Sequence, residues 1–211
     1  MFSDQTWLAR LIWIALLLVA FTAMVQLRWE LAFVALATLT LSLVPVFVAR
    51  WAEITVPASF ISAVVVFVGG TLFLGEVFDF YERFWWWDVA MHGSSAVGFG
   101  LIGFVLVFMM FQGDRFAAPP VAVSFFAFCF GLSIGAVWEM FEFGMDQLFG
   151  FNMQKSGLID TMGDLIVDMI GAGIGAATGY VYLKQREYGW LTSVIDEFIR
   201  RNPRLFKRLR K

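Results

Sequence analysis

The sequence predicts an all-α protein, a polytopic bundle of about six transmembrane helices with an amphipathic helix at the C-terminus. Hydrophobic residues make up 60% of the 211 positions and the mean hydropathy is +0.78, both far above the values of soluble domains. Apolar runs of the length needed to cross a bilayer, about 20 residues, recur along the chain. They leave no room for a separate soluble domain. We expect residues 1–187 to form one membrane domain and residues 188–211 a tail.

The apolar runs are separated by short polar or turn-forming segments. The first run lacks the basic start and the small-residue cleavage site of a signal peptide, so we expect it to be retained. Pro57 opens the third run, and Pro119 with Pro120 precedes the fifth, at positions where a proline ring is tolerated. The expected spans are residues 7–25, 30–49, 57–74, 88–111, 121–147 and 160–183.

Small residues recur at four-residue spacing in the last two spans. Gly131 and Gly135 form one such pair, and Gly171, Gly175 and Gly179 form two more. This spacing lets helix backbones approach closely. We therefore expect the fifth and sixth spans to pack against each other through these glycines.

The tail combines an apolar stripe with many basic residues. Ile195, Phe198 and Ile199 repeat at helical spacing, which favours a helix lying on a membrane surface over a nucleic-acid-binding segment. By the positive-inside rule the tail is cytoplasmic, so both termini of a six-span protein of the inner (plasma) membrane lie in the cytoplasm. We expect the basic residues to bind anionic lipid: Arg200, Arg201, Arg204, Lys207, Arg208, Arg210 and Lys211.

Ionisable residues form stripes within three of the apolar spans. They follow helical spacing in each span, so each set lines one face of its helix. A charged residue at a helix centre costs about 2.5 to 3.5 kcal/mol on insertion scales, so such residues mark a candidate site. The stripes are Asp88 with His92, then Glu139, Glu142 and Asp146, and finally Asp160, Asp164 and Asp168.

The three stripes overlap in depth. At 1.5 Å per residue, all of them fall in the half of the bilayer opposite the cytoplasmic termini. So many carboxylates need compensating cations or shared protons. Carboxylates with one imidazole suit Mg²⁺, Mn²⁺, Fe²⁺ or Zn²⁺, and the expected ligands are His92, Glu139, Glu142, Asp164 and Asp168.

Structural roles compete with metal binding at several of these positions. Asp88 and Asp160 stand where spans begin and are equally explained as helix N-caps. His92 alone is equally explained as a hydrogen-bonding link between helices. We assign supporting or capping roles to Asp88, Asp146 and Asp160.

The segments Trp87–His92, Trp138–Phe143 and Gly157–Ala172 resemble the VanZ-like superfamily of small membrane proteins, and within it the YjdF family. The resemblance covers roughly residues 76–180. It matches Asp88 and His92 to the family's Asp-x-x-x-His element, and the two acidic stripes to its polar helices. VanZ proteins typically carry Gln and Asn near the positions of Glu142 and Asp168, so the site of this chain is more acidic.

Three functions fit this pattern. The first is a metal-dependent enzyme acting on a lipid or polyprenyl headgroup, in which Glu139, Glu142 and Asp164 are catalytic. The second is a proton- or cation-coupled transporter, which needs polar groups that continue across the bilayer. The third is a non-catalytic subunit or envelope-stress factor within a homo-oligomer or a larger membrane complex.

Overall fold

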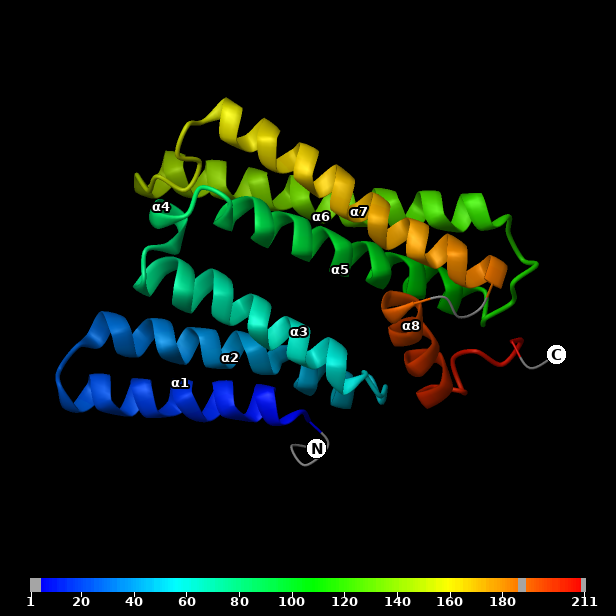
Figure 1. The fold of residues 1–211 in the computed structure, drawn as a ribbon, viewed down its shortest axis with the longest axis horizontal. Coiled ribbons are helices and arrows are strands. Elements are labelled where there is room, and N and C mark those ends of the chain that lie inside the picture. Colours follow the sequence, from blue (N-terminus) through cyan, green and yellow to red (C-terminus); the bar gives the residue numbers. More distant parts are fainter. Residues whose placement is uncertain (1–4, 186–188, 210–211) are drawn as a thin grey trace. The chain divides into compact units, whose positions relative to one another are not determined.

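The computed structural model describes residues 5–185 and 189–209, which are helical apart from turns and short loops (Figure 1). This part of the chain contains eight α-helices, one π-helical segment and no strand, which confirms the predicted all-α class. Six helical stretches are long and apolar enough to cross a membrane. Their ends differ from the predicted spans by at most three residues.

The chain divides into two compact units, residues 1–87 and 88–211, and each is described by itself. The first unit contains α1 (Trp7–Val25), α2 (Trp29–Trp51), α3 (Ala58–Val68), the π-helical segment η1 (Gly69–Val77) and the short α4 (Phe80–Arg83). Its core contains Trp13, Val46 and Ile61, and the Trp13 indole donates to Ser42 Oγ over 3.0 Å. The unit thus satisfies a polar ring nitrogen inside apolar packing.

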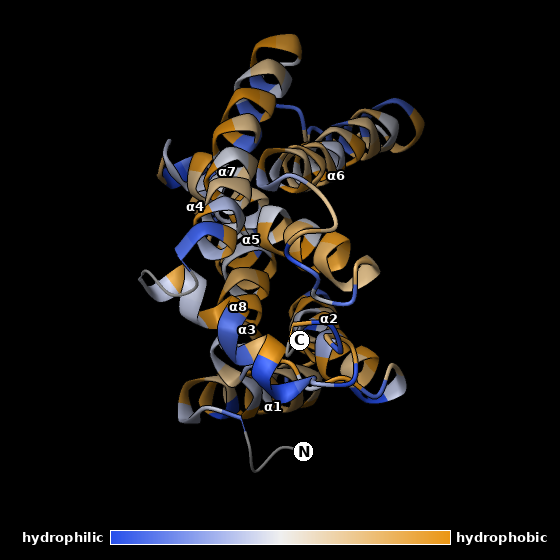
Figure 2. Ribbon diagram, turned by 90° about the vertical axis from the view of Figure 1, so that its right-hand side faces the viewer, coloured by the Kyte–Doolittle hydropathy of each residue, from blue (hydrophilic) through white to orange (hydrophobic). Residues whose placement is uncertain are grey.

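The second unit contains α5 (Trp87–Met110), α6 (Pro120–Phe149), α7 (Leu158–Gln185) and α8 (Trp190–Arg201). Helices α5, α6 and α7 lie side by side (Figure 1). Hydrophobic residues predominate on these helices, whereas α8 carries both hydrophilic and hydrophobic segments (Figure 2). The three long helices position the candidate site.

Glycines determine how closely these helices pack. A Cβ at Gly100 of α5 would lie 2.9 Å from the carbonyl oxygen of Ala172 on α7, and Gly131 of α6 is equally close to both helices. The close approach of α6 and α7 occurs as predicted at the glycines of α6. The glycines of α7 differ from the prediction, because Gly171, Gly175 and Gly179 face α5. Spacing identifies a small-residue face but does not identify the helix that packs on it.

The end of the second unit opposite the acidic residues is fastened by the loop between α5 and α6. Arg115 Nη2 donates to the carbonyl oxygen of Tyr182 over 2.8 Å and also to that of Leu183, near the end of α7. The segment after α8 returns to this loop, where the Arg208 amide donates to Gln112 O over 2.9 Å. Phe206 of this segment is 2% exposed and packs against Phe108.

Helix α8 forms where an amphipathic helix was predicted, and its apolar face is buried within the second unit. Ile195, Phe198 and Ile199 are at most 9% exposed. Its predicted lipid-binding residues are partly engaged in ion pairs: Arg200 with Asp196, Arg201 with Glu197, and Arg208 with Asp114. Arg204 and Lys207 are exposed, and Arg210 and Lys211 lie outside the described residues.

Candidate functional site

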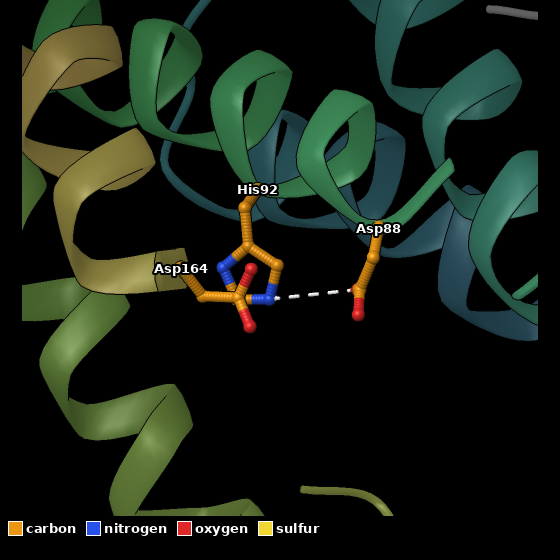
Figure 3. A group of neighbouring side chains, drawn as sticks. All are labelled: Asp88, His92 and Asp164. Atoms are coloured by element: carbon orange, nitrogen blue, oxygen red, sulfur yellow. Dashed lines mark ion pairs between the residues drawn. The ribbon is translucent and has the colours of Figure 1, made fainter. Parts of the chain in front are cut away.

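The candidate site lies at the end of the second unit where α5 and α7 begin. His92, in the second turn of α5, is 7% exposed and is surrounded by carboxylates from its own helix and from α6 and α7. Figure 3 shows Asp88 and His92 on one helix and Asp164 approaching the imidazole from another. One oxygen from each of these carboxylates and one ring nitrogen all lie within 4.8 Å of one another.

The two ring nitrogens of His92 face different carboxylates. Nδ1 lies 3.3 Å from Asp168 Oδ2, within hydrogen-bonding distance. Nε2 lies 3.9 Å from Asp88 Oδ1 and 3.8 Å from Glu139 Oε1. If Asp168 accepts the Nδ1 proton, the lone pair of Nε2 points toward Asp88 and Glu139. A carboxylate commonly orients a metal-binding histidine in this way.

Two of these carboxylates are buried with oxygens that lack ordinary hydrogen bonds. Glu139 is 4% exposed, and within the described residues neither of its oxygens has a hydrogen-bond partner of normal geometry, although the Thr161 side chain is close enough to influence it. Asp168 is fully buried, and its Oδ1 is likewise without a partner. A buried charged group of this kind is costly unless a cation or proton compensates it.

The Asp168 side chain packs directly against Gly135 of the neighbouring helix α6. A Cβ at Gly135 of α6 would overlap Asp168 Oδ2 and would come 2.6 Å from its Cγ. The absence of a side chain at this position therefore makes room for the carboxylate that contacts His92. The sequence suggested Gly135 only as a helix-packing residue.

The remaining predicted residues lie at the margin of this cluster. Glu142 is half-buried one turn beyond Glu139, and its Oε1 accepts a hydrogen bond of 2.9 Å from Trp138 Nε1 on the same helix. Asp160 lies in the first turn of α7. The N-cap explanation of Asp88 and Asp160 is wrong, because α5 and α7 begin at Trp87 and Leu158 and both carboxylates lie inside the first turn.

Asp146 orders the loop between α6 and α7. Its Oδ1 accepts the amide of Met153 over 2.7 Å and its Oδ2 accepts that of Gln154 over 2.9 Å. The next residue, Lys155, extends to the cluster, and its Nζ lies 3.4 Å from Asp88 Oδ2. Sequence reasoning missed Lys155 as a site residue, although it is the one basic residue between α6 and α7.

The interior of the second unit beyond the site contains few polar groups. His92 is followed along α5 by Ala96 and Gly100, and Asp168 along α7 by Ala172 and Gly175, all of them buried. The backbones meet closely at this level, with Gly100 against Gly175. The arrangement can hold one or more cations at one end of the three helices.

Comparison with known proteins places this architecture in a family. A family model described as "Predicted membrane protein (DUF2238)" matches residues 6–185, which include all six candidate spans and the whole acidic cluster. A Thermotoga maritima protein described as an uncharacterized protein is 33% identical over 103 residues, covering 46% of this chain and 50% of that protein. No solved structure matches. The chain is a multi-pass membrane protein and belongs to the DUF2238 family of predicted membrane proteins.

Proposed function

We propose that this protein binds a divalent cation in the pocket around His92 and uses it to act on a lipid headgroup. The observation that carries the proposal is the convergence of Asp88, His92 and Asp164, with Glu139 near His92 Nε2 and carboxylate oxygens beside them that lack hydrogen bonds. An ion with bonds of about 2.1 Å holds neighbouring donors roughly 3 to 4 Å apart. The distances of 3.8 and 3.9 Å from Nε2 fit that spacing.

In this proposal the residues divide into ligands and supporting groups. His92, Asp88, Glu139 and Asp164 are the ligands, and Asp168 orients the imidazole from its other side. The sequence predicted His92, Glu139, Glu142, Asp164 and Asp168 as ligands. In this proposal Asp88 is added to the ligands, while Asp168 and Glu142 become supporting groups. A donor set of carboxylates with one imidazole suits Mn²⁺, Fe²⁺, Zn²⁺ or Mg²⁺.

A bound cation would polarise a phosphate oxygen or activate a water molecule. Glu142 is the candidate general base, because it lies beside Glu139 on α6 and Trp138 holds its carboxylate. The site lies at a helix end, where headgroups are found in a bilayer. The resemblance to the VanZ-like superfamily and the YjdF family belongs to the same proposal, since the motifs that carry it also build this pocket.

We place the pocket on the non-cytoplasmic side of an inner membrane, with both termini in the cytoplasm. The charge distribution of the second unit supports this orientation, because Arg115 and the basic residues of α8 lie at the end opposite the acidic cluster. Labelling of Ser156→Cys with a membrane-impermeant maleimide in a Cys129→Ala background tests it. Reaction in intact cells is expected, and reaction only after permeabilisation would reverse the orientation.

We further propose that Arg204 and Lys207 contact anionic lipid. Both are exposed, and neither forms an ion pair in the described part of the chain, unlike Arg200, Arg201 and Arg208. Each basic residue near an anionic membrane surface contributes about 1 kcal/mol. Replacing both with Gln should reduce retention of phosphatidylglycerol during purification, and unchanged retention would contradict this role.

Metal analysis tests the central proposal. Purified wild-type protein should bind one divalent cation, measured by calorimetry and by elemental analysis after dialysis against Mn²⁺ or Zn²⁺. Asp164→Asn and His92→Gln should each weaken cation binding by at least about tenfold. Loss of a residue that only hydrogen-bonds to a metal ligand already costs about tenfold or more, so loss of a ligand should cost no less. Glu197→Gln on α8 is the control for Asp164→Asn. It also removes one carboxylate charge, but from a surface ion pair at the end of the unit opposite the acidic cluster.

Unchanged Mn²⁺ and Zn²⁺ affinity in Asp164→Asn and His92→Gln, or no binding by folded wild-type protein, would refute the cation site. The lipid step is tested separately by phosphorus NMR of vesicles of phosphatidylglycerol and phosphatidylethanolamine incubated with metal-loaded protein. Headgroup release should be lost in Asp164→Asn and kept in Glu197→Gln. Metal binding with no change in any lipid would leave a cation-binding protein and would remove the enzymatic part.

A further inference from the structure

Lys155 is held at the partly exposed edge of the acidic cluster by an ordered loop. The preceding amides of Met153 and Gln154 donate to the Asp146 carboxylate, and the Gln154 side chain donates to Thr161 Oγ1 over 2.6 Å. These bonds tie the loop to the end of α6 and the start of α7. The position of Lys155 is therefore fixed by hydrogen bonds from its loop to both α6 and α7.

Lys155 and the proposed cation share one carboxylate. Asp88 Oδ2 lies 3.4 Å from Lys155 Nζ, while Asp88 Oδ1 lies 3.9 Å from His92 Nε2. The side chains of Lys155 and Asp88 are 29% and 23% exposed, whereas those of Glu139 and Asp168 are at most 4% exposed. The Lys155–Asp88 pair thus lies on the more exposed side of the cluster, where the ammonium is accessible to a ligand.

A divalent cation bound through Asp88 would repel the Lys155 ammonium, because like charges a few ångströms apart interact strongly in a partly buried site. An anion beside the Lys155–Asp88 pair would reverse this effect, since it would attract both the ammonium and the metal. Lysine is a common point-charge ligand for phosphate. The exposed side of the Lys155–Asp88 pair is where such a group can approach.

Resting on the proposed cation site, we infer that the substrate of this pocket carries a phosphate group and that Lys155 recognises it. In the metal-free protein Lys155 occupies Asp88 as a tethered competitor of the metal. A phosphate draws the ammonium away, frees Asp88 for the metal and binds next to both. Metal and phosphate therefore strengthen each other's binding, and the coupling is reciprocal.

Free Mn²⁺ measured by electron paramagnetic resonance tests this coupling in phosphatidylcholine nanodiscs. The proteins are wild type, Lys155→Met, Lys155→Arg and the control Lys184→Met, which removes a lysine beside Tyr180 near the other end of α7. Without phosphate, Lys155→Met should bind Mn²⁺ about fivefold tighter or more, within the usual range of coupling between sites. Lys184→Met should match wild type.

Added phosphate should then separate the variants. Glycerol 3-phosphate, or phosphatidic acid placed in the disc, should tighten Mn²⁺ binding by wild type and Lys155→Arg by about fivefold or more, and should tighten it much less in Lys155→Met. Empty discs and Lys155→Met correct for phosphate that binds Mn²⁺ by itself. A response to phosphatidic acid alone identifies a lipid as the phosphate source, and a response to glycerol 3-phosphate alone identifies a soluble one. A response to both supports recognition of the phosphate group itself.

Three results would overturn the inference. Weaker or equal Mn²⁺ binding by Lys155→Met would mean that Lys155 does not compete with the metal for Asp88, while Mn²⁺ binding by wild type would still support the cation site. The absence of any effect of either phosphate probe on wild type would exclude phosphate recognition. The absence of Mn²⁺ binding by all four folded proteins would refute the cation site and this inference together.

Discussion

Adding a single methyl group at Gly135 should displace the Asp168 carboxylate and destabilise the protein. In Gly135→Ala the added Cβ would overlap Asp168 Oδ2 and lie 3.0 Å from Asp168 Cβ, so the carboxylate must move or α6 and α7 must separate. Overpacking of this kind costs about 1 to 3 kcal/mol. The displaced carboxylate also loses its contact of 3.3 Å with His92 Nδ1.

Helix propensity acts in the opposite direction and supplies the control. Replacing glycine with alanine inside a helix stabilises it by up to about 1 kcal/mol. Gly144 lies on the same helix, and apart from the neighbouring backbone of α6 no atom lies within 4 Å of a Cβ built there. Gly144→Ala should therefore be neutral or slightly stabilising, and Gly135→Ala should be less stable than Gly144→Ala by about 1 to 3 kcal/mol.

Two measurements on the purified proteins test this prediction. The free energy of unfolding, from detergent titration, should fall only in Gly135→Ala. Divalent-cation affinity should fall about 10- to 100-fold in the same variant, the usual effect of losing the partner that orients a metal-binding histidine. If Gly135→Ala matches Gly144→Ala in both measurements, the position of the Asp168 carboxylate does not depend on the absence of a side chain at residue 135, and the prediction is wrong.

Two further predictions concern the opposite end of the second unit. Arg115→Gln removes the charged donor to the carbonyl oxygens of Tyr182 and Leu183 and should cost about 1.5 to 3 kcal/mol in unfolding free energy, with cation affinity unchanged. Phe206→Ala should cost about 3 to 5 kcal/mol because the ring is 2% exposed, whereas Phe116→Ala, at a residue 98% exposed, should change stability little. Equal stability of the two phenylalanine variants would mean that the C-terminal segment does not pack as described.

Most of the fold could be predicted because each span reflects a local property, the length of an apolar run. Residues 7–25 were predicted as the first span and form α1 with the same bounds. The third span differs, because a π-helical segment at Gly69–Val77 extends it three residues beyond the expected end. A π-helix depends on packing such as that of Gly75 against the Tyr81 ring, which hydropathy does not encode.

The acidic residues were predictable as helix faces, but their individual roles were not. Spacing placed Asp164 and Asp168 on one face, yet only the contact with His92 Nδ1 distinguishes Asp168 from the carboxylates near Nε2. Asp88 was predicted as a supporting or capping residue, but its carboxylate lies 3.9 Å from the imidazole of His92, one turn along the same helix. Lys155 was missed because its position depends on hydrogen bonds made by Asp146 to a loop.

The tail shows a different limit of sequence reasoning. An apolar stripe opposite charged residues has the same pattern whether it lies on lipid or on protein. In α8 the stripe formed by Ile195, Phe198 and Ile199 is buried within the second unit. The deciding partner is Phe206, whose ring lies beside Phe198 after the chain turns at Pro203.

The distribution of the acidic cluster over three helices has a consequence for biosynthesis. Helix α7 is the least apolar of the six candidate spans and carries Asp164 and Asp168 into the bilayer. An aspartate within a membrane span raises the free energy of insertion, so α7 enters the membrane most easily when its partners are already there. His92 and Gly135 are synthesised before α7. The groups that contact or accommodate the two aspartates are therefore synthesised before α7 itself.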